Sequence, residues 1–154
     1  MNGPEVKLDD LYQEVILDHN RKPRNFGKLD DTNASSHGHN PLCGDDYFLY
    51  LTLSGGKIEK VAFQGQGCAI SKASASLMTE AIKGKSVGEV EMLKDNFVHL
   101  LTDSAVSDST RQGAGKMKFF EGVKNFPIRV KCATLIWRAL EDALTSYEKE
   151  GEKK

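Results

Sequence analysis

The residues of this sequence best suited to chemistry are its three cysteines, Cys43, Cys68 and Cys132. They are odd in number and widely spaced, whereas a secreted protein held together by disulfides carries an even and dense set. Such thiols act as buried packing residues, metal ligands or nucleophiles. Composition does not distinguish these roles, so the local setting of each cysteine has to be considered.

Each cysteine lies at a predicted junction between two elements. Cys43 lies in residues 40–45 (NPLCGD), whose proline and glycine indicate a turn. Cys68 follows residues 65–67 (GQG), where a strand changes to a helix, and Cys132 lies in the predicted first turn of the last helix. The free amides and positive dipole end of a helix N-terminus favour thiolate over thiol. Metal binding or reactivity explains three such positions better than packing alone.

Zinc is the metal that suits these side chains. It takes four ligands in a tetrahedron, usually thiolates or imidazoles and sometimes a carboxylate. The cysteines supply three ligands, and Asp45, two residues after Cys43, is the nearest candidate for the fourth. The sequence contains no Cys-x-x-Cys pair, so the ligands come from distant segments and the fold must assemble the site.

Other polar residues are weaker candidates. His37 and His39 alternate and could bind a metal from one face of a strand, but a polar surface pair is the favoured interpretation. Asp18 and His19, at the end of the predicted first helix, are expected to be solvated or to cap that helix. Residues 65–67 lack the Gly-Lys-Ser/Thr ending of a phosphate loop, which argues against nucleotide binding.

The pattern of the whole chain predicts an α+β fold. Helical periodicity predicts helices over residues 8–22, 69–83, 86–101 and from 127 towards the C-terminus. Two-residue alternation predicts strands over 47–53 and 58–63, joined by a glycine turn. The order predicts one compact domain, 1–154, in which helices pack on one face of a small antiparallel sheet. We find no internal repeat and no domain linker.

Two stretches are harder to interpret. Residues 30–39 are polar and rich in small side chains, which predicts a loop leading into a possible short strand. Residues 102–115 are polar, contain glycine and show no clear period, which predicts a surface loop or insertion. Directly after them, Phe119, Phe120 and Val123 suggest a short helical turn.

Composition sets the class of the protein. The 154 residues include 39% hydrophobic and 28% charged side chains, which excludes disorder and predicts a soluble globular domain. A net charge of −1 argues against nucleic-acid binding. No stretch approaches the roughly 20 apolar residues of a membrane helix, and the N-terminus does not resemble a signal peptide. We therefore expect a cytoplasmic protein.

The near-zero net charge hides an uneven distribution. Residues 111–138 contain seven basic side chains and one acidic one, and residues 89–108 contain five acidic side chains and one lysine. One interpretation is an ordinary mixed surface. The other is a basic patch around Cys132 that docks an acidic protein and helps to keep the thiols ionised.

Three motifs together resemble the U-type scaffold family of iron–sulfur cluster assembly, which includes IscU and the N-terminal domain of NifU. They are residues 40–45 (NPLCGD), 65–74 (GQGCAISKAS) and 128–132 (IRVKC). The resemblance runs in order from about Leu8 to Tyr147. Within this family the chain is most similar to the SufU branch, for two reasons. Lys131 stands where IscU-type members typically have histidine, and residues 102–122 match an insertion typical of SufU-type members.

The resemblance implies a SufE/NifU-like α+β fold with zinc bound by Cys43, Asp45, Cys68 and Cys132. For the SufU branch it implies a zinc-dependent sulfurtransferase. A SufS-type cysteine desulfurase would pass persulfide sulfur to Cys43, for relay to downstream iron–sulfur assembly proteins. In the family picture a desulfurase histidine takes one zinc position and frees this thiol, while Cys68 and Cys132 stay as ligands. Arg129 is a candidate for contacting the desulfurase.

Two alternatives remain open at this point. One is a scaffold of the IscU type, which assembles a [2Fe–2S] cluster on the same three cysteines and is a binding module rather than an enzyme. The absence of histidine before Cys132 argues against this role without excluding it. The other is a purely structural zinc domain, which would unfold when its metal is removed.

Overall fold

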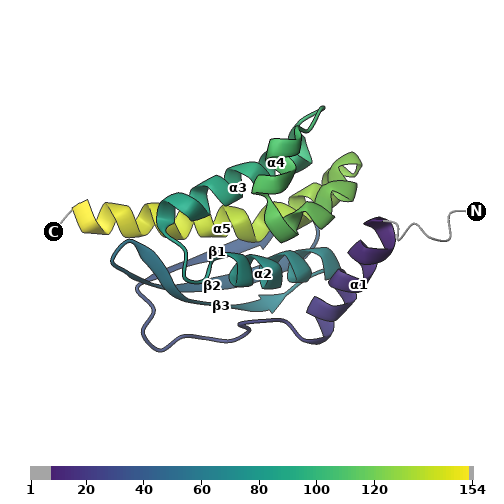
Figure 1. The fold of residues 1–154 in the computed structure, drawn as a ribbon. Coiled ribbons are helices and arrows are strands. Elements are labelled where there is room, and N and C mark those ends of the chain that lie inside the picture. The colour runs from purple at the N-terminus through teal and green to yellow at the C-terminus, as the bar shows by residue number, and fades with distance from the viewer. Residues whose placement is uncertain (1–7, 153–154) are drawn as a thin grey trace, which may run out of the picture.

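The structure, a computed structural model, describes residues 8–152. These residues form a three-stranded antiparallel sheet with helices on one side (Figure 1). The strands lie in the order β1-β2-β3. The elements are α1 (Leu8–Arg21), β1 (Ala34–Asn40), β2 (Asp45–Ser54), β3 (Lys57–Gln66), α2 (Ala69–Ile82), α3 (Val87–Thr102), α4 (Asp108–Gly113), the 3₁₀ helix η1 (Gly115–Asn125) and α5 (Pro127–Glu152).

The sheet has one covered face, as the alternation along β2 requires. Tyr47, Leu49 and Leu51 are fully buried, whereas Phe48 between them is 42% exposed. Helices α2 and α5 pack directly on the covered face, and α3 lies over them on the side away from the sheet (Figure 1). The predicted fold class, α+β with helices on one face of a small antiparallel sheet, is confirmed.

Local signals account for several element boundaries. Ser86 and Glu89 form the predicted capping box at the start of α3, each side chain accepting from the other residue's backbone N–H. The turn between β2 and β3 places Gly55 and Gly56 at positive φ, which suits a tight hairpin turn. Pro127 opens α5 at the first helical position, where its missing N–H costs nothing.

Strand β1 is longer than the sequence predicts. All seven of its residues, Ala34–Asn40, pair with β2, from Ala34 opposite Leu51 to Asn40 opposite Asp45. Its side chains are small or polar, so they carry little hydrophobic alternation. Pairing with β2, rather than intrinsic strand preference, specifies this strand.

The structure differs from the surface loop predicted over residues 102–115, because helix α4 lies within that stretch. The short helical turn predicted at Phe119, Phe120 and Val123 is confirmed, and it belongs to the longer 3₁₀ helix η1. Ala114, Met117, Phe120 and Val123 are all buried. Their spacing of three residues matches the repeat of a 3₁₀ helix, so they share one face directed into the core. This spacing does not fit the 3.6-residue period of an α-helix, so the full length of η1 was not predicted. The assignment of residues 102–122 as an insertion stays a prediction.

No helix within residues 8–152 combines the length and the apolar character needed to cross a membrane. The expectation that the N-terminus is not a signal peptide concerns mainly residues 1–7, which lie outside the described residues. The predicted single domain, 1–154, also extends beyond the described range at both ends.

Candidate metal centre

Segments that are distant in the sequence meet beside the tip of the β1–β2 hairpin and bring three predicted ligands together. One ligand atom from each of Cys43, Asp45 and Cys132 lies within 4.8 Å of the other two. The Sγ atoms of Cys43 and Cys132 are 3.5 Å apart. Within residues 8–152 this is the one cluster of three or more His, Cys, Asp or Glu side chains close enough to share a metal ion.

Cys68, the fourth predicted ligand, lies beside this cluster rather than within it. It is the N-cap of α2, as its position before that helix predicts, and its Sγ accepts from the backbone N–H of Ser71 at 3.4 Å. Its own backbone N–H donates to Asp45 Oδ1 at 2.8 Å, and its Sγ lies 3.9 Å from Asp45 Oδ2. Asp45 therefore connects Cys68 to the other two cysteines.

The turn that carries Cys43 is organised by Asn40. The carbonyl oxygen of Asn40 accepts from the backbone N–H of Cys43 at 3.2 Å and from that of Gly44 at 2.9 Å. Its side-chain oxygen accepts from the N–H of Leu42, and its amide nitrogen lies 3.5 Å from Cys43 Sγ. Gly44 has φ +74°, which favours glycine there. The sequence motif included Asn40, but its role was not predicted.

The position of Cys132 in the last helix differs from the prediction. Helix α5 begins at Pro127, so Cys132 is in the second turn, beyond the region where a helix N-terminus favours a thiolate. Its side chain is only 4% exposed, and this burial raises the pKa of the Cys132 thiol, with hydrogen bonding to Cys43, Cys68 and Asp45 acting in the same direction. The predicted stabilisation of a thiolate by the helix is wrong for Cys132, because burial dominates. A cation at the site would favour ionisation instead.

The donor set fits zinc. Asp45 is fully buried, and no lysine, arginine or histidine within residues 8–152 forms an ion pair with it. A buried carboxylate normally has a charged partner or a metal. Thiols together with one carboxylate form a set that zinc accepts, whereas magnesium and calcium prefer oxygen ligands alone.

Comparison with known proteins identifies the family. The family model for the NifU-like N terminal domain matches residues 11–133, which include all three cysteines and Asp45. The chain belongs to this family. The predicted resemblance to the IscU/NifU-like proteins is therefore confirmed.

Individual members of the NifU-like family are similar along nearly the whole chain. The zinc-dependent sulfurtransferase SufU of Bacillus subtilis is 42% identical, over 93% of this chain and 95% of its own. The iron–sulfur cluster assembly scaffold protein IscU of Streptococcus pyogenes is 40% identical, over 90% of this chain and 85% of its own. A crystal structure of an iron–sulfur cluster assembly scaffold protein for the SUF system, from Fervidobacterium islandicum, is 37% identical. It has a TM-score of 0.78 and covers 85% of this chain and 94% of that one.

The hydroxyl groups of Tyr47 and Ser71 lie close to Asp45 and Cys68. Tyr47 is fully buried, and its hydroxyl lies 3.0 Å from Ser71 Oγ. Burial raises the pKa of Tyr47 to about 12, so this hydroxyl keeps its proton. Neither residue was predicted from the sequence to have a role in the site. The position of Tyr47 could have been predicted from the sequence, because strand residues two apart point to the same face and Tyr47 is two residues after Asp45.

The remaining candidates lie outside the cluster. His37 is exposed, stacks on Phe48 with ring centroids 4.3 Å apart and contacts Asp46, which confirms the interpretation as a surface residue. Its ring also stacks with that of His39. Arg129 is exposed, with its guanidinium 4.6 Å from the ring centroid of Phe126, three residues before Cys132.

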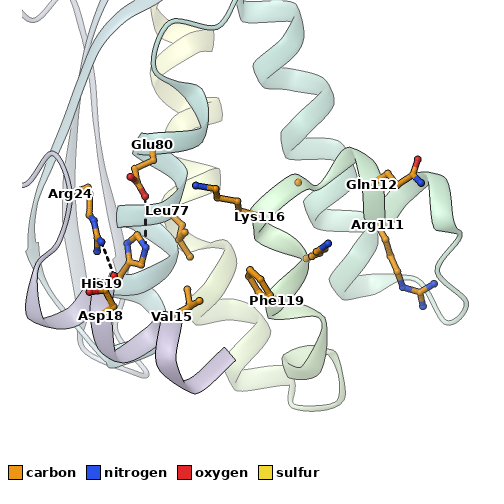
Figure 2. Close-up of a pocket in the computed structure, with 12 residues that line it drawn as sticks. Val15, Asp18, His19, Arg24, Leu77, Glu80, Arg111, Gln112, Lys116 and Phe119 are labelled. Atoms are coloured by element: carbon orange, nitrogen blue, oxygen red, sulfur yellow. Dashed lines mark hydrogen bonds and ion pairs between the residues drawn. The ribbon is translucent and has the colours of Figure 1, made fainter. Parts of the chain in front are cut away.

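A separate cavity of about 720 Å³ lies between α1, α2, α4 and η1, and no cysteine lines it (Figure 2). Four of the ionisable residues that line it form two pairs. Asp18 binds Arg24 at 2.6 Å, and Glu80 lies 3.7 Å from His19. The cavity wall between these pairs is formed partly by apolar side chains such as Leu77 (Figure 2).

His19 in this cavity wall is not solvated as predicted. It is 5% exposed, and its Nδ1 lies 2.7 Å from Ser76 Oγ of α2. The residue follows Tyr12 and Ile16 on the inward face of α1, at the helical spacing that buries a side chain. Burial lowers the pKa of His19, with the nearby positive charge of Arg24 acting in the same direction. His19 therefore joins α1 to α2 as a neutral side chain.

Proposed function

We propose that this protein is a zinc-dependent sulfurtransferase that accepts persulfide sulfur on Cys43. The donor is a SufS-type cysteine desulfurase, and the sulfur passes on to downstream iron–sulfur assembly proteins. The observation that carries this proposal is the cluster of Cys43, Asp45 and Cys132, with Cys68 hydrogen-bonded to Asp45. The similarity to a relative named zinc-dependent sulfurtransferase, over 93% of this chain, supports it.

Cys43, Asp45, Cys68 and Cys132 would hold the zinc ion. Bound zinc keeps coordinating thiols ionised at neutral pH. Cys68 and Cys132 lie within or at the start of long helices, which favours a fixed position. Cys43 lies on a partly exposed hairpin tip, so it can reach a partner with the least rearrangement of the fold.

The transfer step is a thiol–disulfide exchange. The Cys43 thiolate attacks the outer sulfur of the desulfurase persulfide, and a new bond forms between Cys43 Sγ and that sulfur. The sulfur–sulfur bond in the desulfurase breaks, and its cysteine leaves as a thiolate. The step exchanges one sulfur–sulfur bond for another, so it requires no external oxidant or reductant.

The surface beside the site suits contact with a protein partner. Leu42, next to Cys43, is 83% exposed, and Ile128 at the start of α5 is 68% exposed. Exposed apolar side chains beside a charged group are typical of interaction surfaces. We assign Arg129 to this contact with the desulfurase. Because reduced thiols persist in the cytoplasm, we also place the protein there.

A scaffold that assembles a [2Fe–2S] cluster is the second candidate. Cysteine thiolates are the usual ligands of such clusters, and the site brings thiols and one carboxylate together. Several relatives, including the 40% identical protein of Streptococcus pyogenes, are named IscU scaffolds. Lys131 before Cys132, in place of the histidine typical of IscU-type members, favours the sulfurtransferase.

Metal content and desulfurase turnover distinguish these functions. We expect aerobically purified protein to contain one zinc ion per chain and no iron. Added to a SufS-type desulfurase with cysteine, the wild type should increase the rate of alanine formation, and Cys43→Ala should not. A bound iron–sulfur cluster without any stimulation would favour the scaffold. A Cys43→Ala variant that stimulates turnover normally would contradict the role of Cys43.

A further inference from the structure

Tyr47 and Ser71 connect the covered face of the sheet to the start of α2, beside the metal ligands. Tyr47 follows Asp45 on β2, and Ser71 is the third residue of α2, three positions after Cys68. Both side chains are buried, with Tyr47 fully inaccessible and Ser71 1% exposed. Their hydroxyl oxygens are 3.0 Å apart.

Ser71 makes three contacts with Cys68. Its backbone N–H donates to Cys68 Sγ at 3.4 Å, and its hydroxyl donates to the carbonyl oxygen of Cys68 at 3.0 Å. The same hydroxyl oxygen lies 3.6 Å from Cys68 Sγ. A serine hydroxyl has one proton and two lone pairs, so Ser71 can donate to Cys68 while it accepts from Tyr47. The two hydroxyls can thus form a chain of hydrogen bonds that ends on Cys68.

Asp45 belongs to the same group of oxygen atoms. A Cβ atom added at Gly67 would lie 2.5 Å from Asp45 Oδ1, 2.6 Å from Ser71 Oγ and 2.7 Å from the Tyr47 hydroxyl. Three polar oxygens therefore surround one point that is free because residue 67 has no side chain. Asp45 Oδ1 accepts from the Cys68 N–H, and Oδ2 lies 3.9 Å from Cys68 Sγ.

We propose that Tyr47 and Ser71 are positioning residues of the metal centre, which orient Cys68 and Asp45 for the ion, and that Gly67 provides the space they need. The proposal rests on the proposed function in so far as the bound ion is zinc. Outer residues that hydrogen-bond to metal ligands commonly contribute about 10- to 100-fold in metal affinity. Asn40 positions Cys43 from the hairpin side, and Tyr47 and Ser71 position Cys68 and Asp45 from the core.

The test is the zinc affinity of four proteins, measured by competition with a chromophoric chelator. We expect Tyr47→Phe and Ser71→Ala to bind zinc about 10- to 100-fold more weakly than the wild type. Tyr50→Phe is the matched control, since Tyr50 is on the same strand, on the opposite face, and its hydroxyl accepts from Gln64 at 2.9 Å. It should bind zinc like the wild type. Wild-type affinity in both Tyr47→Phe and Ser71→Ala would overturn the proposal.

A double variant tests whether the hydroxyls act in series. If Tyr47 acts through Ser71, Tyr47→Phe combined with Ser71→Ala should lose no more affinity than Ser71→Ala alone. If the two substitutions instead reduce zinc affinity independently, so that their fold-changes multiply in the double variant, the chain of hydrogen bonds is contradicted. Co²⁺ added in place of zinc provides a second readout, because its visible absorption reports ligand geometry. We expect a changed spectrum in Ser71→Ala and an unchanged one in Tyr50→Phe.

Urea unfolding of the metal-free proteins separates positioning from a general structural role. A structural role alone would lower the free energy of unfolding and leave the zinc affinity of the folded protein unchanged, which would overturn the proposal. If Tyr47→Phe does not fold, Ser71→Ala decides the outcome. A wild type that binds zinc but accepts no sulfur would contradict the sulfurtransferase and leave this inference standing, whereas a wild type without zinc affinity would overturn the inference.

Discussion

At the scale of single residues, the surroundings of the predicted metal ligands affect their chemistry in different ways. Burial raises the pKa of Cys132 although α5 begins five residues earlier. Asp45 is held by a backbone N–H rather than by a cation. Asn40 makes contacts with its backbone and its side chain that fold the turn around Cys43.

Replacing Asn40 tests the importance of that turn. Asn40→Ala removes the side-chain acceptor of the Leu42 N–H and the donor to Cys43 Sγ, so Cys43 should lose its fixed position. We expect zinc affinity to fall by about tenfold, at the low end of the effect of groups that orient metal ligands. Competition with a chelator measures it.

Asn33→Ala is the control for this prediction. Asn33 makes two side-chain hydrogen bonds to the backbone of Leu53, at the opposite end of the same pair of strands. Its removal should cost roughly 1–2 kcal/mol in the free energy of unfolding and leave zinc affinity unchanged. Equal losses of zinc affinity in the two variants would show that the effect is general strand destabilisation.

At the scale of elements, the sequence predicts what is strongly periodic and locally signalled. The hairpin of β2 and β3, the capping box at Ser86 and the long helix from Pro127 all follow from local patterns. Strand β1 does not, because it is specified by pairing with β2. Only the turn at Phe119, Phe120 and Val123 is predicted of η1, because the buried residues of this helix repeat every three positions rather than every 3.6. Pairing between strands leaves no strong pattern within one segment.

The contact between α1 and α2 through His19 predicts a pH dependence of stability. The pKa of His19 is lowered in the folded protein, so the unfolded chain binds the proton more readily. The neutral side chain contributes fully to the free energy of unfolding above the ordinary histidine pKa of about 6.5. This contribution is lost as the pH falls through the lower pKa that His19 has in the folded protein. The free energy of unfolding should therefore decrease as the pH falls below about 6.5.

Urea unfolding at a series of pH values measures this dependence in the wild type and in His19→Gln. Glutamine can retain a hydrogen bond to Ser76 but does not titrate, so its stability should decrease less over the same interval. His99→Gln is the control, because His99 is exposed and its ring bonds only to the nearby Asp103 among the residues that the structure describes. A pH dependence in His19→Gln as steep as in the wild type would contradict this account.

At the scale of the whole molecule, the site exists because segments that are distant in the sequence meet at one place. Sequence motifs predict Cys43, Asp45, Cys68 and Cys132 as ligands, since each lies in a distinctive local pattern. They do not reveal that Asp45 connects Cys68 to the other cysteines, that Cys132 is buried or that Tyr47 contacts Ser71. These features depend on how β2, α2 and α5 pack.

The most direct test of the central claim is to locate the transferred sulfur. The zinc-loaded protein would be mixed with a persulfide-charged SufS-type desulfurase for a single turnover, digested without reductant and analysed by mass spectrometry. The account predicts one additional sulfur atom on the peptide that contains Cys43, and none on any peptide of Cys43→Ala. Sulfur found on Cys68 or Cys132 in the wild type, or undiminished transfer to Cys43→Ala, would contradict it.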